Sequence, residues 1–351
     1  MESKSVRQSN IELLRIIAIF MVMIAHCNGH MAEGSIPAMT ANADAVVVCR
    51  NIIGSLASIC VVLFVLISGW FSIKPNLKRI ATLWTQIFFV YLYVFILQTI
   101  IQNHGEVNWK TLVTCFLPFT FSIWFVRAYL LLMLFAPALN LFAKDISKRG
   151  FQLFLAIFTI MALLYGCIIP SDSAGFNKGL SPLSLIYIYM VGRYLRLYVH
   201  STRSKWFWLC GYVVFSMVIF IGRVIHLPWI LYYINPILVL SAISLFMFFV
   251  KLDIGYNRFI NWVASSVFTA FILHTRPPVS KWLIDFNVHQ LQTLSYINYL
   301  GVIFVVLVGF FIIAVLMDKV REFIFRPIIK WIDRVVISTD ENEKFISIKK
   351  Q

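Results

Sequence analysis

Charged residues are scarce in this chain. They make up 13% of its 351 residues, whereas 60% are hydrophobic. So little charge cannot cover the surface of a water-soluble protein of this length, which excludes an ordinary globular domain. Acidic residues are rarer than basic ones: the chain has 15 Asp and Glu and 30 Lys and Arg, which gives a net charge of +15. The basic excess therefore needs an explanation, either from membrane topology or from an acidic partner.

Several motifs of soluble enzymes are also missing. The six cysteines are scattered without a Cys-x-x-Cys pair, so we interpret them as small buried apolar residues and not as metal ligands. His26 and His30 lie four residues apart, but no third ligand is near them, and we expect no metal site. There is no phosphate-binding Gly-x-x-x-x-Gly-Lys loop, no Gly-x-Ser-x-Gly nucleophile elbow and no internal repeat.

Long hydrophobic runs recur from residue 11 to residue 317. The hydrocarbon core of a bilayer needs about 20 apolar residues in a helix, so the runs predict an all-α, polytopic membrane helix bundle with about ten transmembrane helices. The first run does not form a short signal peptide that precedes a polar mature domain. We therefore expect it to be a retained span. We expect a membrane domain over residues 1–330 and a polar cytoplasmic tail over 331–351. The predicted spans are 11–28, 49–73, 80–101, 122–142, 151–169, 182–199, 206–221, 228–250, 259–275 and 297–317.

The basic residues lie mainly on one side of these spans. If the N-terminus is cytoplasmic, the basic residues that we assign to the far side are only Arg50, Lys110, Lys178, Arg223, Arg276 and Lys281. The positive-inside rule then places both termini in the cytoplasm of a multi-pass protein of the cell (plasma or inner) membrane, with its cations near anionic lipid. Membrane topology thus explains the net charge, and we expect no nucleic-acid partner. The sequence does not indicate an oligomeric state.

The first predicted helix contains an ordered set of ionisable residues. At about 100° per residue, the eleven-residue step from Arg15 to His26 ends about 20° from full turns, so both side chains share one face, about 16 Å apart in height. Glu12 lies one turn before Arg15 on the same side. One interpretation is an interfacial ion pair and an unrelated helix-end histidine. The alignment favours a polar stripe that faces the bundle interior, where His26 acts as a general base.

This stripe resembles the signature of the membrane-bound acyltransferase family 3. Arg15 and His26 have the Arg-x10-His spacing of that signature, and Arg15 ends the segment Asn10-Ile11-Glu12-Leu13-Leu14-Arg15. Further matching segments occur in the family's order. Trp70 stands where Phe or Tyr is commoner, and no esterase-like domain follows the last helix, so we expect a stand-alone enzyme. The further segments are Ser68-Gly69-Trp70, Trp124-Phe125-Val126-Arg127-Ala128-Tyr129 and Phe271-Ile272-Leu273-His274.

The resemblance implies a membrane-bound O-acyltransferase. Such an enzyme takes an acyl group, usually acetyl, from cytoplasmic acyl-CoA and transfers it to a hydroxyl of an envelope carbohydrate. The acceptor would be capsule, lipopolysaccharide, exopolysaccharide or a lipid-linked precursor. Acetyl-CoA is then a donor substrate, and we expect no bound cofactor. The alternative is a secondary transporter or flippase of lipid-linked sugars, which often shows inverted repeats or broken helices that we do not find. A structural or receptor-like protein would not need the polar stripe.

The resemblance also implies roles for several residues. Arg15, Lys78 and Arg79 would bind the donor's phosphates, although Lys78 and Arg79 also satisfy the positive-inside rule. We expect His26 to be the catalytic base that deprotonates the acceptor, with an acyl-histidine relay as the alternative.

The remaining candidates lie in the first, fourth and ninth predicted spans, except that Arg276 directly follows the ninth. Arg127 and Tyr129 are assigned to catalysis, where they would stabilise an oxyanion or orient a sugar. The aromatic residues also suit an interfacial belt, and the late histidine and arginine suit a helix C-terminus. Substrate binding is assigned to Glu12, Trp124, His274 and Arg276.

Overall fold

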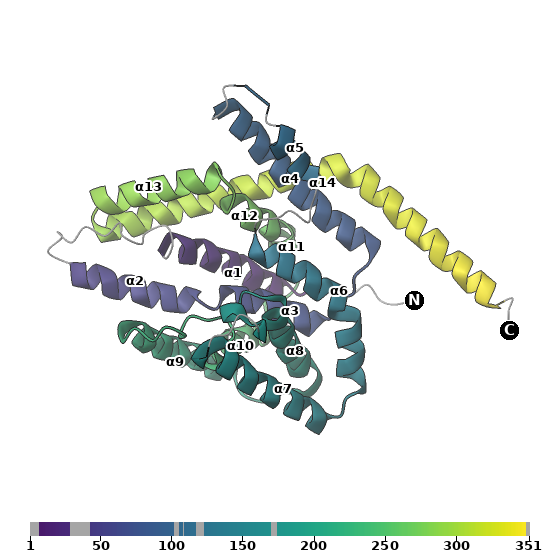
Figure 1. Cartoon of the computed structure of the whole chain (residues 1–351), viewed down its shortest axis with the longest axis horizontal. Helices are drawn as coiled ribbons and strands as arrows, with labels where there is room; N and C mark the ends of the chain where they lie inside the picture. The colour runs from purple at the N-terminus through teal and green to yellow at the C-terminus, as the bar shows by residue number, and fades with distance from the viewer. Residues whose placement is uncertain are drawn as a thin grey trace.

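The computed structural model describes residues 7–28, 43–101, 105–107, 109–116, 123–169 and 174–348. Among these residues every regular element is helical and no strand occurs (Figure 1), which confirms the predicted all-α class. A π-helical turn, Leu164–Ile168, follows α7. The helices are α1 (Ser9–Asn28), α2 (Ala43–Ala57), α3 (Cys60–Phe71), α4 (Leu77–Ile101), α5 (Trp109–Phe116), α6 (Trp124–Asp145), α7 (Lys148–Leu163), α8 (Pro182–Tyr198), α9 (Lys205–Val224), α10 (Pro236–Val250), α11 (Arg258–Ala264), α12 (Val267–His274), α13 (Val279–Thr293) and α14 (Tyr296–Ile348).

Seven helical segments within the described residues are long and apolar enough to cross a bilayer. The predicted span 49–73 corresponds to α2 and α3, which together form one such segment. A helix of this length matches the thickness of the hydrocarbon core. The seven segments are Ser9–Asn28, Val46–Phe71, Leu77–Ile100, Trp124–Asp145, Lys148–Ile168, Lys205–Val224 and Tyr296–Val335.

The other three predicted spans are shorter helices. Helix α8 has 17 residues and α10 has 15. The predicted span 259–275 is two helices, α11 and α12, because the chain leaves helical hydrogen bonding at Ser265 and Ser266. The membrane-helix class is therefore confirmed, whereas the count of ten spans and the cytoplasmic position of both ends stay predictions.

Local sequence explains where the short helices begin. Helices α8 and α10 each start with proline at the first helical position, where its missing N–H is not needed. The residue before each proline, Ser181 or Asn235, accepts a hydrogen bond from a backbone N–H of the first turn through its side-chain oxygen. Both helix starts are therefore fixed by side-chain caps despite the apolar surroundings.

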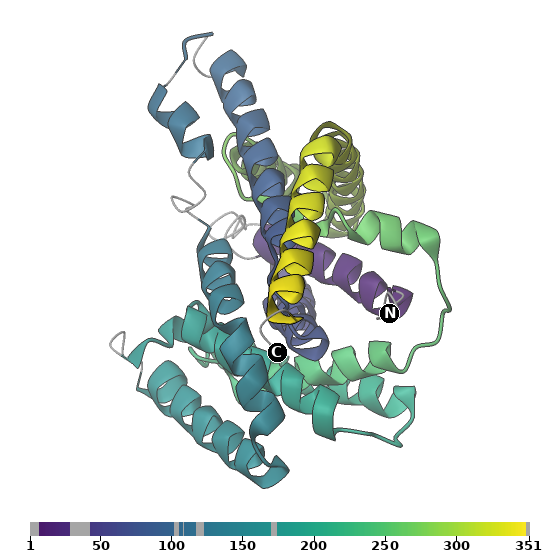
Figure 2. The same ribbon diagram turned by 90° about the vertical axis from the view of Figure 1, so that its right-hand side faces the viewer.

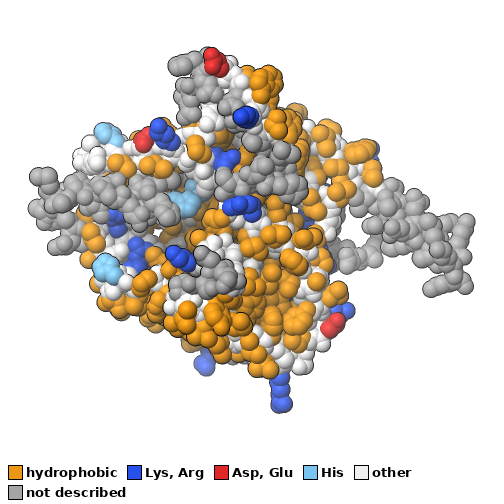
Figure 3. Space-filling view, in the orientation of Figure 1, with side chains coloured by type: hydrophobic (Ala, Val, Ile, Leu, Met, Phe, Trp, Pro, Cys, Tyr) orange, Lys and Arg blue, Asp and Glu red, His pale blue; other side chains and the backbone are white. Residues whose placement is uncertain are grey.

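Hydrophobic side chains cover much of the outer surface (Figure 3). Large exposed apolar residues occur on α6, α9 and α14, for example Leu134, Val214 and Phe304. In water such a surface would drive aggregation, whereas hydrocarbon accepts it without cost. The exposed apolar faces thus mark the sides that we expect to contact lipid.

Helix α1 lies at the centre of the bundle. It packs against α2, α3, α10, α11 and α12 (Figure 1), and its Glu12 is buried. A carboxylate on a lipid-facing surface would have no partner and would cost several kcal/mol. The polar face of α1 therefore points into the protein, as its periodicity predicted.

Two glycines let α3 and α8 pack closely. A Cβ atom at Gly69 would collide with the carbonyl oxygen of Tyr189, and one at Gly192 would lie 2.6 Å from the carbonyl oxygen of Leu66. Only glycine permits backbones to approach this closely, as in other membrane helix pairs. The glycine of the Ser68-Gly69-Trp70 segment thus has a packing role in the α3–α8 contact.

Helix α14 is much longer than the predicted last span. It runs from Tyr296 to Ile348 without a break, through Pro327, although the sequence suggested a span that ends at residue 317 and a tail from 331. It packs against α4 and α12, and Figure 2 shows it lying along α4. Because the helix continues, residues just after 317 remain beside the bundle and contribute to its interior. The domain boundary at residue 330 stays a prediction.

Candidate active site

Two histidines from distant parts of the sequence meet in the bundle. His26, near the end of α1, places Nδ1 2.9 Å from Nε2 of His274, at the end of α12. The two ring centroids are 4.9 Å apart, and His274 is buried while His26 is half-buried. The sequence placed these residues in separate roles, but the structure joins them in one pair.

The partners of His274 determine which nitrogen of each ring carries a proton. His274 Nδ1 lies 3.0 Å from the carbonyl oxygen of Ala270, which can only accept, so this nitrogen is the donor. For neutral His274, Nε2 is then an acceptor, and it receives the hydrogen bond from Nδ1–H of His26. A neutral His26 in this arrangement holds its lone pair on Nε2. The pair therefore orients His26 as a base, because the partner of its other nitrogen fixes the tautomer.

A cavity of about 390 Å³ leads towards this pair from the beginning of α1. At one end lie Glu12 and Arg15, and further along lie Val22, one turn before His26, and Phe271, whose ring centroid is 5.9 Å from that of His274. The predicted polar stripe thus follows the cavity, and its charged end lies about 16 Å below the histidine. The cavity lining is Arg7, Glu12, Arg15, Val22, Val61, Phe64, Ser68, Thr82, Leu83, Gln86, Phe125, Tyr129, Ala264, Ser265, Val267, Phe268, Phe271, Arg321 and Glu322.

Arg15 and Glu12 form an ion pair within this cavity. Arg15 Nη1 lies 3.0 Å from Glu12 Oε1, and the side chains are 34% and 9% exposed. The carboxylate is therefore enclosed, whereas part of the guanidinium remains accessible. With five donors in a fixed fork, an arginine can keep such a partner and still bind an anionic ligand.

A second polar contact crosses the middle of the cavity. The Ser68 hydroxyl donates to the carbonyl oxygen of Phe64 at 2.8 Å, so its oxygen is available to accept from the Tyr129 hydroxyl at 3.0 Å. Tyr129 also stacks on Phe125, with ring centroids 5.7 Å apart. The Ser-Gly segment and the Trp-Phe segment are therefore in direct contact, and Tyr129 presents a hydroxyl in the cavity wall.

A buried ion pair on α14 was not predicted from the sequence. Arg321 Nε lies 2.8 Å from Asp318 Oδ1, and both side chains are almost fully buried. Thr269 donates to the same carboxylate oxygen at 2.7 Å, and Arg321 donates to Thr85 at 3.1 Å. Their i, i+3 spacing resembles that of Glu12 and Arg15, but the last predicted span ended at residue 317 and so did not include them. Arg321 and Glu322 line the cavity opposite α1.

We expect this buried pair to stabilise the bundle strongly. Replacing Asp318 by asparagine should lower the free energy of unfolding by about 3–5 kcal/mol, because the buried Arg321 would lose its close partner and keep only the partly exposed Glu322, 3.8 Å away. Asp333→Asn is a matched control, since Asp333 pairs with Lys78 at 2.7 Å and both side chains are largely exposed; such pairs contribute about 0–1 kcal/mol. Thermal unfolding of the detergent-purified proteins compares the two. Equal unfolding temperatures for the two variants would contradict this expectation.

Lys78 and Arg79 lie outside the cavity. Lys78 pairs with Asp333 of α14, and Arg79 donates to the carbonyl oxygen of Lys74 at 2.8 Å. Their contacts are those of residues that tie the start of α4 to its neighbours. The structure thus brings Arg15 into the cavity but does not bring Lys78 or Arg79 there, and their binding of phosphate stays a prediction.

The outer candidates are also separated. The Arg127 side chain is exposed and does not line the cavity, whereas Tyr129 on the same helix does. Trp124 stacks on Tyr233 with centroids 6.0 Å apart. The Arg276 guanidinium carbon lies 3.8 Å from the ring centroid of Tyr91, beside a separate small cavity. Arg127 therefore lacks the position for acting on a substrate in the cavity, and Trp124 and Arg276 have packing contacts elsewhere.

The chain matches the profile of the acyltransferase domain family, acyltransferase family 3, over residues 8–319. It thus belongs to this family of membrane acyltransferases, as the motifs around Arg15 and His26 suggested. The match extends past Asp318 and so includes part of α14. No curated protein and no solved structure gives a significant match.

Proposed function

We propose that the protein transfers an acyl group, in the simplest case acetyl, from acyl-CoA to a hydroxyl of an envelope carbohydrate. The observation that carries this proposal is the position of the oriented His26–His274 pair. It lies one helical turn beyond one end of a cavity, and arginines line the other end of that cavity. A base next to a channel for an anionic thioester is what acyl transfer to a hydroxyl requires. Family membership supports the acyl transfer itself, and the donor and the acceptor are our proposals.

The donor would enter at the charged end of the cavity. A volume of 390 Å³ suits the thioester-bearing arm of acyl-CoA, not the whole molecule, so the nucleotide would stay at the mouth. There, Arg7, Arg15 and Arg321 lie on the walls, and charge-assisted hydrogen bonds from guanidinium groups favour phosphate oxygens. The arm would then extend past Tyr129 towards Phe271.

The chemistry follows from the orientation of His26. Nε2 accepts the proton of the acceptor hydroxyl as the oxygen attacks the thioester carbonyl carbon. We assign the developing oxyanion to the Tyr129 hydroxyl in the cavity wall, which would turn its hydrogen from Ser68 to the substrate oxygen when the donor binds. When the carbon–sulfur bond breaks, the CoA thiolate takes the proton from His26, and the ester and free CoA leave.

Replacing Arg15 by glutamine should raise the KM for acyl-CoA at least about tenfold, because a charge-assisted hydrogen bond contributes about 1.5–3 kcal/mol to binding. We expect kcat to change much less, since Arg15 lies far from the reacting bond. Initial rates with reconstituted protein measure both constants. Arg258→Gln removes the same charge from an exposed site outside the cavity and should leave both unchanged. An unaltered KM in Arg15→Gln would place the phosphate site elsewhere.

The proposed activity is tested in cells. Mass spectrometry of envelope polysaccharides compares cells with the intact gene, without it, and with His26→Ala. Acetyl increments that mild alkali removes should appear only with the intact gene, and the glycan that carries them identifies the acceptor. Identical profiles in all three would contradict a carbohydrate acceptor. In that case, consumption of acyl-CoA by purified protein would separate another acceptor from a transport function.

A further inference from the structure

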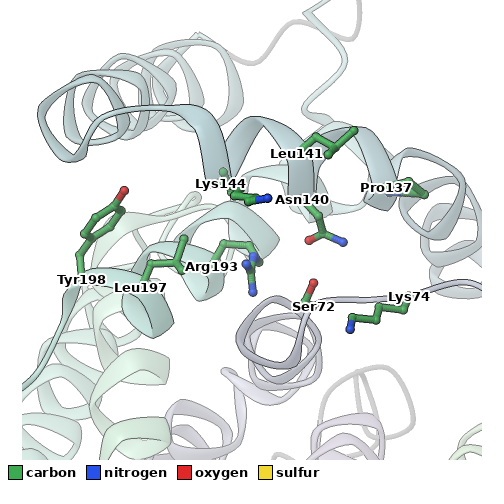
Figure 4. Close-up of a pocket in the computed structure, with 10 residues that line it drawn as sticks. Ser72, Lys74, Pro137, Asn140, Leu141, Lys144, Arg193, Leu197 and Tyr198 are labelled. Atoms are coloured by element: carbon green, nitrogen blue, oxygen red, sulfur yellow. The ribbon is translucent and has the colours of Figure 1, made fainter. Parts of the chain in front are cut away.

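A second, larger cavity lies away from the candidate active site. It has a volume of about 590 Å³ and is formed by the connection between α3 and α4, by the second half of α6 and by α8. It shares no lining residue with the cavity that leads to His26. Figure 4 shows its lining residues, which are Ser72, Lys74, Pro137, Asn140, Leu141, Ala143, Lys144, Arg193, Leu197 and Tyr198.

The charged residues of this cleft all have the same sign. Lys74, Lys144 and Arg193 line it, and among the described residues no carboxylate does. Figure 4 shows the polar ends of Lys144 and Arg193 towards the space between Ser72 and Asn140, and the Lys74 side chain beside Ser72. Like charges that share a small volume repel one another unless an anion lies among them. The cleft thus has the electrostatic character of an anion site.

Arg193 has unused hydrogen-bonding capacity there. Its Nε is buried without a partner among the described residues, and its Nη1 lies 3.5 Å from the Gly69 carbonyl oxygen, at the limit of a hydrogen bond. Buried donors are nearly always satisfied, so we expect the incompletely bonded guanidinium to turn towards a ligand oxygen in the cleft. The amide of Asn140 is already engaged, since it donates to Ile73 and accepts from Tyr189.

The positive-inside rule alone does not explain this arrangement. Lys148 and Arg149, at the start of α7, satisfy the same rule but are exposed and do not line this cleft. Cations near helix C-termini also interact favourably with the helix dipole, which accounts for a position near a helix end but not for three side chains around one space. The convergence is what requires a ligand.

The remaining lining residues are apolar. Pro137 and Leu141 lie on the α6 side and Leu197 lies on the α8 side (Figure 4). Leu141 is 62% exposed, so the α6 side continues onto the outer apolar surface of that helix. A cationic centre beside an apolar surface fits an amphiphile with an anionic head and a hydrocarbon tail. We propose that this cleft binds the phosphate head group of an anionic phospholipid. The proposal goes beyond the acyl transfer and does not depend on it.

Lipid binding to the purified full-length chain tests this proposal. In neutral detergent, phosphatidylglycerol should raise the unfolding temperature, and phosphatidylcholine with the same acyl chains should not. Lys74→Gln/Lys144→Gln should weaken phosphatidylglycerol binding about thirtyfold, since each basic residue near an anionic lipid contributes about a factor of five. Lys148→Gln/Arg149→Gln removes the same charge outside the cleft and should bind like wild type. Both lysines are exposed, so these changes should not impair folding.

Three results would overturn the assignment. The first is an equal rise in unfolding temperature with the two lipids, and the second is an equal loss of phosphatidylglycerol binding in the two double variants. The third is a stabilisation by inorganic phosphate equal to that by phosphatidylglycerol, which would identify a site for free phosphate. Native mass spectrometry of bound lipid gives a second measurement on the same proteins. Retention of phosphatidylglycerol by Arg193→Gln at the wild-type level would remove Arg193 from the site.

Discussion

Replacing His26 by alanine should reduce acyl transfer by about a thousandfold, because the acceptor hydroxyl would lose its general base. The protein should remain folded, since the half-buried ring fills little of the core. Transfer from radiolabelled acetyl-CoA to the identified acceptor, in reconstituted protein, measures the loss. His289→Ala removes an exposed histidine of α13 and serves as the matched control. Activity of His26→Ala within a few fold of wild type would remove this residue from the mechanism.

The same preparation separates direct transfer from an acyl-histidine relay. A relay would label the wild-type protein when the donor is present and the acceptor is absent, and His26→Ala would stay unlabelled. Direct transfer leaves both proteins unlabelled. We expect the second result, because the donor and acceptor can react in one step beside an oriented base.

Replacing His274 by alanine should reduce transfer by about a hundredfold, at the low end of the effects of general-base catalysis. His26 would keep its place but lose the acceptor that holds Nδ1 protonated. His274→Gln should recover much of the rate, since its side-chain oxygen can reach the position of Nε2. His274→Asn is the matched variant, because the shorter amide can reach only the position of Nδ1, near Ala270.

The difference between these two amides distinguishes a positioning role from a packing role. A residue that only fills space would tolerate both amides or neither. Equal rates for His274→Gln and His274→Asn would therefore contradict the assigned tautomer. Thermal unfolding of both variants identifies any loss of rate that comes from a loss of folded protein.

The part of the site that could be predicted from the sequence lies within one helix. Glu12, Arg15 and His26 are ordered by helical periodicity, which depends on spacing alone. Their burial followed from the high cost of ionisable groups in lipid. The motifs that contain Ser68 and Tyr129 were also found, although their hydrogen bond could not be.

Contacts between distant segments could not be predicted in this way. His26 and His274 are 248 positions apart, and periodicity gives the face of each helix but not the partner of that face. The Asp318–Arg321 pair was missed for a different reason, since hydropathy falls after residue 317 while the helix continues. Charged residues that follow an apolar run can still lie inside a bundle when a neighbouring helix covers them, as α4 and α12 do here.

The rings of Phe125 and Phe271 have an electrical consequence for the cell. Their centroids lie 5.4 Å apart at the end of the cavity nearest the histidines. A continuous file of water past this point would conduct protons down the membrane potential, which is worth about 2.3 kcal/mol per charge at 100 mV. Two hydrocarbon rings interrupt such a file without adding a charge of their own. The apolar rings between the charged end of the cavity and the histidine pair therefore oppose proton leakage across the membrane.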